Sequence, residues 1–143
     1  MADPCYLFGL VFESAFNKEI DFESDTIKCS LHTSSYTPDQ DTHQYWDVSV
    51  DNEASGTGYS AGGVTLSNPT IGYDAGTNVV SLDAGDADFS GNEAAARYAV
   101  IYDDTPASNK PLIAYIDFGE DKTPTSLTFN ANGIATVTVA ALA

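Results

Sequence analysis

The chain has 143 residues, the size of one domain, and 43% of them are hydrophobic, so it can bury a core without a disulfide or a metal. Five basic against 21 acidic residues give a formal net charge of −16, which excludes a phosphate-neutralising surface for nucleic acid and opposes binding to anionic membranes. We therefore expect a single domain over residues 1–143 whose partners are proteins, with neither nucleic acid nor membrane among them.

The first predicted element is an amphipathic helix over residues 4–17. An Asp-Pro pair supplies an N-cap and a suitable first helical residue, and Phe8, Phe12 and Phe16 recur every four residues. The segment lacks the basic start and the cleavage site of a signal peptide, so we expect a protein made in the cytoplasm. Residues 1–25 are expected to form a helical N-terminal segment packed on the rest of the domain.

Residues 26–32 predict a half-buried strand, because apolar and polar residues alternate strictly along them. Ile27, Cys29 and Leu31 form the apolar face, on which we expect the phenylalanine stripe of the helix to pack. Two cysteines do not make a disulfide framework, so Cys29 and Cys5 are expected to remain thiols that pack as small hydrophobic residues.

The sequence Thr-Pro-Asp-Gln over residues 37–40 has the form of a capping box and predicts a short helix that ends near Trp46. Beyond this helix, short apolar segments alternate with turn signals, which favours an antiparallel β-sandwich or a small barrel. Hairpin turns are expected at residues 74–76 and 132–133, and a long loop over residues 84–96. The expected strands are residues 64–66, 70–73, 78–83, 97–103, 112–118, 126–130 and 134–139.

Catalytic and metal-binding motifs are weak throughout the sequence. His32 and Cys29 lie on opposite faces of the predicted strand, which argues against a Cys–His pair, and a four-ligand zinc site would need every Cys and His of the chain. Asp83, Asp86 and Asp88 lie in a Gly-containing loop that is either solvated or a calcium site, although their spacing fits no EF-hand. We therefore expect no catalytic residue, no cofactor and no metal ligand, and leave calcium at this loop as the open alternative.

Aromatic residues and the single arginine are the candidates for protein contacts. Tyr45 and Trp46 end the predicted short helix, where either core packing or an interface role would suit them. Arg97 is expected to pair with a carboxylate, either within the chain or across an interface. The candidate interface anchors are Tyr36, Tyr45, Trp46, Tyr59 and Arg97.

Four stretches of the sequence resemble a family of small structural proteins of tailed bacteriophages. They are Leu-His-Thr-Ser-Ser-Tyr-Thr-Pro-Asp-Gln-Asp-Thr-His over 31–43, Gly-Thr-Gly-Tyr-Ser-Ala-Gly-Gly over 56–63, Ala-Arg-Tyr-Ala-Val-Ile-Tyr-Asp-Asp over 96–104 and Leu-Ile-Ala-Tyr-Ile-Asp-Phe-Gly over 112–119. The resemblance runs over nearly the whole chain and implies a virion component without catalytic residues. Residues 88–90 depart from the family's pattern, so we assign no function to them.

The resemblance, the small size and the acidity together favour a capsid decoration or cement protein. Such a protein would bind the outer surface of the major capsid protein as a homo-oligomer, with a trimer favoured, and would be located in the virion. One alternative is a tail or head-tail connector component, which would form a larger ring. A less favoured alternative is a carboxylate-based glycosidase, which would need a cleft with two carboxylates and a raised pKa at one of them.

Overall fold

A computed structural model describes residues 3–129 and 133–140 of the chain. Its architecture is mainly β, with antiparallel sheets and two short helices, and it is similar to a β-sandwich. This confirms the fold class that the alternating segments predict. No helix within the described ranges is long and apolar enough to span a membrane.

The largest sheet, with the segments that cover it, is called the body here. Its five strands are antiparallel and lie in the order β1-β8-β7-β2-β3. A two-stranded sheet of β6 and β9 accompanies it. The bounds are β1 (Cys5–Leu7), β2 (Ile27–His32), β3 (Val64–Thr65), β6 (Ala87–Asp88), β7 (Ala96–Asp103), β8 (Leu112–Lys122) and β9 (Ser126–Leu127).

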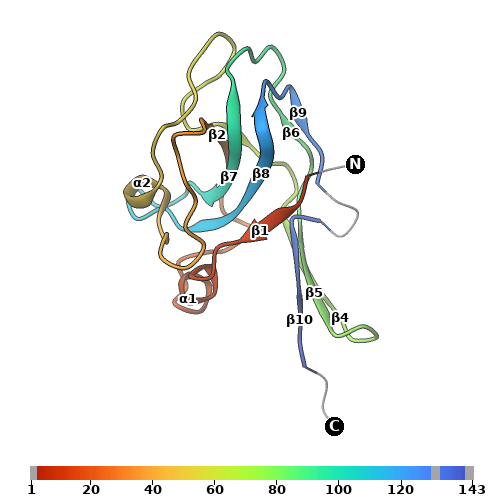
Figure 1. The fold of residues 1–143 in the computed structure, drawn as a ribbon. Helices are drawn as coiled ribbons and strands as arrows, with labels where there is room; N and C mark the ends of the chain where they lie inside the picture. The colour runs from red at the N-terminus through yellow and green to blue at the C-terminus, as the bar shows by residue number, and fades with distance from the viewer. Residues whose placement is uncertain (1–2, 130–132, 141–143) are drawn as a thin grey trace.

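A second, three-stranded sheet is called the arm here. It has the order β10-β5-β4, with β4 (Thr70–Asp74), β5 (Val79–Asp83) and β10 (Ala135–Thr138). Figure 1 shows these strands projecting away from the body, on the side where helix α1 (Val11–Phe16) also lies. The outer part of the arm therefore extends beyond the other segments of the described chain.

The five-stranded sheet is buried on both faces. One face belongs to the main core, with Cys29, Leu31 and Ile101 fully buried. Val100 and Tyr102 on the other face pack in a second cluster of buried residues. The polar face predicted for β2 is therefore not exposed, because the chain between β2 and β3 folds back over it.

The predicted N-terminal helix is wrong over most of its length. Its first residues form β1, an edge strand that pairs with β8, so tertiary pairing overrides the local helical pattern. Helix α1 has only six residues. Phe8 is buried in the second cluster, whereas Phe12 is 44% and Phe16 87% exposed. The phenylalanine stripe does not pack on Ile27, Cys29 and Leu31, which lie in the main core.

The second predicted helix is displaced. Within the capping-box sequence, Oδ1 of Asp39 accepts the backbone N–H groups of Asp41 and Thr42 at 3.0 and 3.1 Å, which closes a turn. Helix α2 (Trp46–Ser49) begins where the predicted helix ends. The backbone N–H of Trp46 donates to the carbonyl of Lys110 at 2.7 Å, so a tertiary contact fixes this start.

Most of the later strands are confirmed with small changes of boundary. Strand β8 runs four residues further than expected, to Lys122, and the expected loop over 84–96 contains β6. The turn between β4 and β5 is confirmed. Strand β9 ends at Leu127, and Asn130 and Asn132, which belonged to an expected strand and an expected turn, lie outside the described residues.

Candidate functional site

A serine and a histidine meet on one face of β2. Residues two apart on a strand share a face, and Oγ of Ser30 lies 2.8 Å from Nε2 of His32. Nδ1 of His32 lies 2.9 Å from the carbonyl oxygen of Asp51, and Nε1 of Trp46 donates to Oγ of Ser30 at 2.9 Å. The sequence-based search for catalytic motifs missed this pair, although the i, i+2 spacing of Ser30 and His32 on the predicted strand was a signal for it.

This cluster is satisfied internally and closed to substrates. Trp46 donates to Ser30, the hydroxyl of Ser30 donates to Nε2 of His32, and Nδ1–H of His32 donates to Asp51, so one tautomer pairs every group. Burial lowers the pKa of His32, which keeps the ring neutral. Ser30 is 0% and His32 1% exposed. The network therefore fixes Trp46 against β2 and offers no reachable nucleophile.

The two cysteines are free thiols on the other side of the sheet from this cluster. Cys29 is buried in the main core, and Cys5 packs against this core. Both positions are those expected for small hydrophobic residues. Burial raises the pKa of Cys5 to about 12 and raises that of Cys29 as well. Both thiols thus remain protonated near neutral pH, and a protonated thiol is a weak nucleophile.

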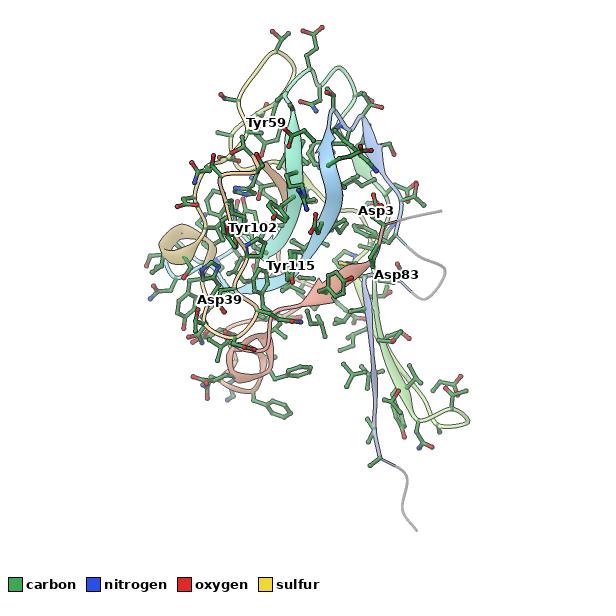
Figure 2. All side chains as sticks on the ribbon, in the orientation of Figure 1. Asp3, Asp39, Tyr59, Asp83, Tyr102 and Tyr115 are labelled. Atoms are coloured by element: carbon green, nitrogen blue, oxygen red, sulfur yellow. The ribbon has the colours of Figure 1, made fainter. Side chains whose placement is uncertain are left out.

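The acidic loop after β5 does not form a metal cluster. No group of three or more His, Cys, Asp or Glu side chains that could hold an ion occurs within residues 3–129 and 133–140. Oδ1 of Asp83 accepts the backbone N–H of Ala84, and Oδ1 of Asp88 accepts both donors of Ser90. Figure 2 shows Asp83 near the base of the arm. These carboxylates stabilise local turns of the chain.

One carboxyl has a raised pKa but is enclosed by the chain. Asp103 ends β7 and is 0% exposed. Its Oδ1 accepts the backbone N–H of Thr105 at 2.9 Å, while its Oδ2 has no hydrogen-bond partner in the described part of the chain. Burial and the neighbouring Asp25 raise the pKa of Asp103 to about 7. A glycan cannot reach a carboxyl enclosed in this way, so the feature does not favour a glycosidase.

Three of the candidate interface anchors are held within their own chain. Tyr36 is only 1% exposed, and its hydroxyl lies 3.0 Å from Nδ1 of His43, so its proposed role as a surface anchor is wrong. The hydroxyl of Tyr59 donates to Glu53 at 2.6 Å and accepts the N–H of Leu31 at 2.9 Å, which ties its loop to β2 (Figure 2). Arg97 forms the expected carboxylate pair, with Asp117 at 2.6 Å.

The other two anchors, Tyr45 and Trp46, are half-buried around the start of α2. The hydroxyl of Tyr45 donates to the carboxylate of Glu19 at 3.0 Å. The Trp46 ring stacks on Tyr102, with ring centroids 4.5 Å apart and planes 9° from parallel. Both side chains thus help to attach this segment to the body, and their exposed parts remain available to a partner.

A large apolar concavity lies between α1 and the arm. This groove has a volume of about 710 Å³. Phe12 and Phe16 contribute from α1, and Ile71, Val80 and Val137 from the three strands of the arm. Its full lining is Leu7, Val11, Phe12, Ala15, Phe16, Lys18, Ile20, Asp21, Phe22, Glu23, Ile71, Val80, Leu82, Ile113 and Val137.

The arm has one apolar and one mostly polar face. Strand register places Ile71 opposite Leu82, Tyr73 opposite Val80, and Val137 also opposite Val80, so these side chains share the face that lines the groove. The other face carries Thr70, Asp74, Val79, Ser81, Asp83, Thr136 and Thr138. The sequence predicted the three strands but not this groove, since the wall formed by α1 depends on how distant segments are placed.

The geometry above therefore offers two kinds of feature, enclosed polar networks in the body and an open apolar groove beside the arm. Comparisons of the chain with protein-family models, with curated proteins and with solved structures found no match in any of the three.

Proposed function

We propose that this chain is a structural protein of a tailed bacteriophage particle, specifically a capsid decoration or cement protein. It would bind the outer surface of the major capsid protein and stabilise the shell. It would act as a homo-oligomer and without a cofactor. The resemblance of four sequence stretches to virion proteins motivates this proposal.

The observation that carries the proposal is the groove between α1 and the arm. Its walls include Phe12, Phe16 and Ile71, which are 44%, 87% and 50% exposed. Proteins that work as isolated monomers rarely expose apolar side chains that gather in this way, and such surfaces mark contacts with other proteins. The Ser30–His32 network, by contrast, is enclosed. The accessible features of this chain thus favour assembly over catalysis.

The charge of the chain also supports a place on the outside of a shell. Four of the five Lys and Arg side chains are paired with carboxylates of the same chain, namely those of Lys28, Arg97, Lys110 and Lys122. The remaining surface carboxylates leave a strongly negative exterior. Packaged DNA would repel such a surface, so the outer face of the capsid is the more favourable location.

Co-sedimentation with empty shells tests the proposal. The purified chain is mixed with shells assembled from the major capsid protein encoded in the same genome, and we expect it to pellet with them at a saturable ratio. Naked DNA serves as the control and should not retain the chain. Absence of the chain from the shell pellet would reject the decoration role. Imaging of intact particles then distinguishes a position on the capsid from one on the tail or connector.

A further inference from the structure

We infer that the groove between α1 and the arm is where a second copy of this chain docks, an inference that rests on the self-association included in the proposed function. The two copies would contribute the same two walls to one shared apolar interface.

Exposed apolar side chains are concentrated on this surface. Seven large hydrophobic side chains of the described residues are exposed, and four of them are Phe12, Phe16, Ile71 and Tyr73. The first three line the groove, and Tyr73 shares the strand face of Ile71. Phe16, at 87% exposure, projects from the wall, so the same surface carries both a protruding ring and a recess. A surface with both can be complementary to itself, as symmetric dimer contacts require.

The described residues leave part of the apolar face of the arm without a cover. All five residues of β4 are exposed, and a small sheet is stable only when its apolar face packs against something. Leu82 and Ala135 at the base of the arm reach the main core, but Ile71, which lies opposite Leu82, and Tyr73 further out are about half exposed. A second copy could cover these outer side chains with its Phe12 and Phe16.

Charge favours another copy at this surface despite the acidity of the chain. Twelve of the fifteen lining residues are apolar, and the others are Lys18, Asp21 and Glu23, so the groove carries a net charge of only −1 against −16 for the chain. Two acidic copies therefore meet here with little local repulsion. Anionic lipid and nucleic acid offer no comparable match to a groove with two carboxylates.

The groove rim also carries complementary charges. Lys18 is the one Lys or Arg side chain without an ion pair inside the described parts of the chain. A two-fold arrangement across the groove would bring Lys18 of each copy toward Asp21 or Glu23 of the other. The contact would thus join apolar walls at its centre to opposite charges at its edge.

Sedimentation velocity over a concentration series tests this interface with the full chain. The test variant is Phe16→Ser, and the matched control is Val48→Ser, which removes another exposed apolar side chain, 68% exposed, from outside the groove. We expect the wild-type chain to self-associate. Phe16→Ser should raise the dissociation constant about tenfold or more, whereas Val48→Ser should leave it within about twofold of the wild-type value. Lys18→Glu should weaken association by a smaller factor.

The outcomes separate this inference from the proposed function. A wild-type chain that stays monomeric at all concentrations overturns the inference, as does equal weakening by Phe16→Ser and Val48→Ser. If a monomeric chain still pellets with shells and loses that binding on Phe16→Ser, the groove receives the capsid protein, which also overturns the inference and retains the decoration role. A chain that self-associates through Phe16 but does not pellet with shells supports the inference and rejects that role.

Discussion

The body and the arm are both built from short antiparallel strands, yet they differ in how much of their surface the chain covers. Strand β7 has six fully buried residues out of eight, whereas all five residues of β4 in the arm are exposed. In the body, the chain after β2 and the N-terminal segment cover the second face of the sheet. Beside the arm lie α1 and the segment that follows it, whose Glu23 accepts the backbone N–H of Ile71, and a groove remains between this wall and the arm.

This difference separates two roles for apolar residues. Burial in the body removes side chains from water during folding and stabilises the chain itself. Apolar residues in the groove would be removed from water only when a partner binds. Substitutions in the body should therefore lower the free energy of unfolding, and substitutions on the groove walls should mainly lower association.

Two phenylalanines four residues apart test this division most directly. Phe8 is 0% exposed in the second cluster, and Phe12 is 44% exposed on the groove wall. Phe8→Ala should lower the free energy of unfolding by about 3–5 kcal/mol, whereas Phe12→Ala should cost less than about 1 kcal/mol. Urea unfolding of the monomer at low concentration measures both. Similar costs for the two variants would show that the groove wall is part of the folding core.

A buried carboxyl makes the stability of the body depend on pH. Because burial and Asp25 raise the pKa of Asp103 to about 7, folded Asp103 retains a proton between pH ~4 and ~7 that the unfolded chain releases. The free energy of unfolding therefore falls as pH rises through this window. Asp103→Asn should be more stable than the wild type above pH 7, by about 1–3 kcal/mol, and the difference should shrink toward pH 4.

Urea unfolding at several pH values measures this effect. Asp41→Asn is the matched control, because it removes one carboxylate from an exposed position. We expect its stability to follow the wild type at each pH. If the free energies of unfolding of Asp103→Asn and the wild type differ by the same amount from pH 4 to pH 8, the raised pKa of Asp103 is contradicted.

Salt should change association more than folding. Two chains of charge −16 repel each other, and salt screens this repulsion more than it screens the few contacts at the groove rim. We therefore expect the dissociation constant to fall by a factor of a few between about 50 and 500 mM NaCl. Sedimentation across the salt series measures it. If association weakens as salt is added, ion pairs and not apolar walls hold the interface together.

A chelator should have the smallest effect. Asp83 and Asp88 accept hydrogen bonds from their own loop, and no three possible ligands gather there in the described part of the chain. We therefore expect the melting temperature to change by less than about 1 °C when EDTA is added. Calorimetry with EDTA, and then with excess Ca²⁺, checks this. A rise of several degrees with Ca²⁺ would restore the calcium alternative for this loop.

The sequence by itself was sufficient for most strands after residue 60, for the turn between β4 and β5, and for the pairing of Arg97 with a carboxylate. Strict alternation fixes which residues of a strand share a face, and it places Ile27, Cys29 and Leu31 together. The same rule would have placed Ser30 beside His32. These features depend on residues close together in the chain or on strong opposite charges, so local patterns are enough to predict them.

Only the tertiary structure decided which faces are covered and which local signals are overridden. Before residue 11, strand pairing with β8 overrode the helical pattern. The capping-box sequence closed a turn instead of starting a helix, because the contacts of Trp46 placed the helix further along the chain. The chain folding back over Ser30 and His32 turned a polar strand face into an enclosed network. The groove depends on α1 and the arm lying side by side, and spacing within a strand carries no information about which distant segment will lie against it.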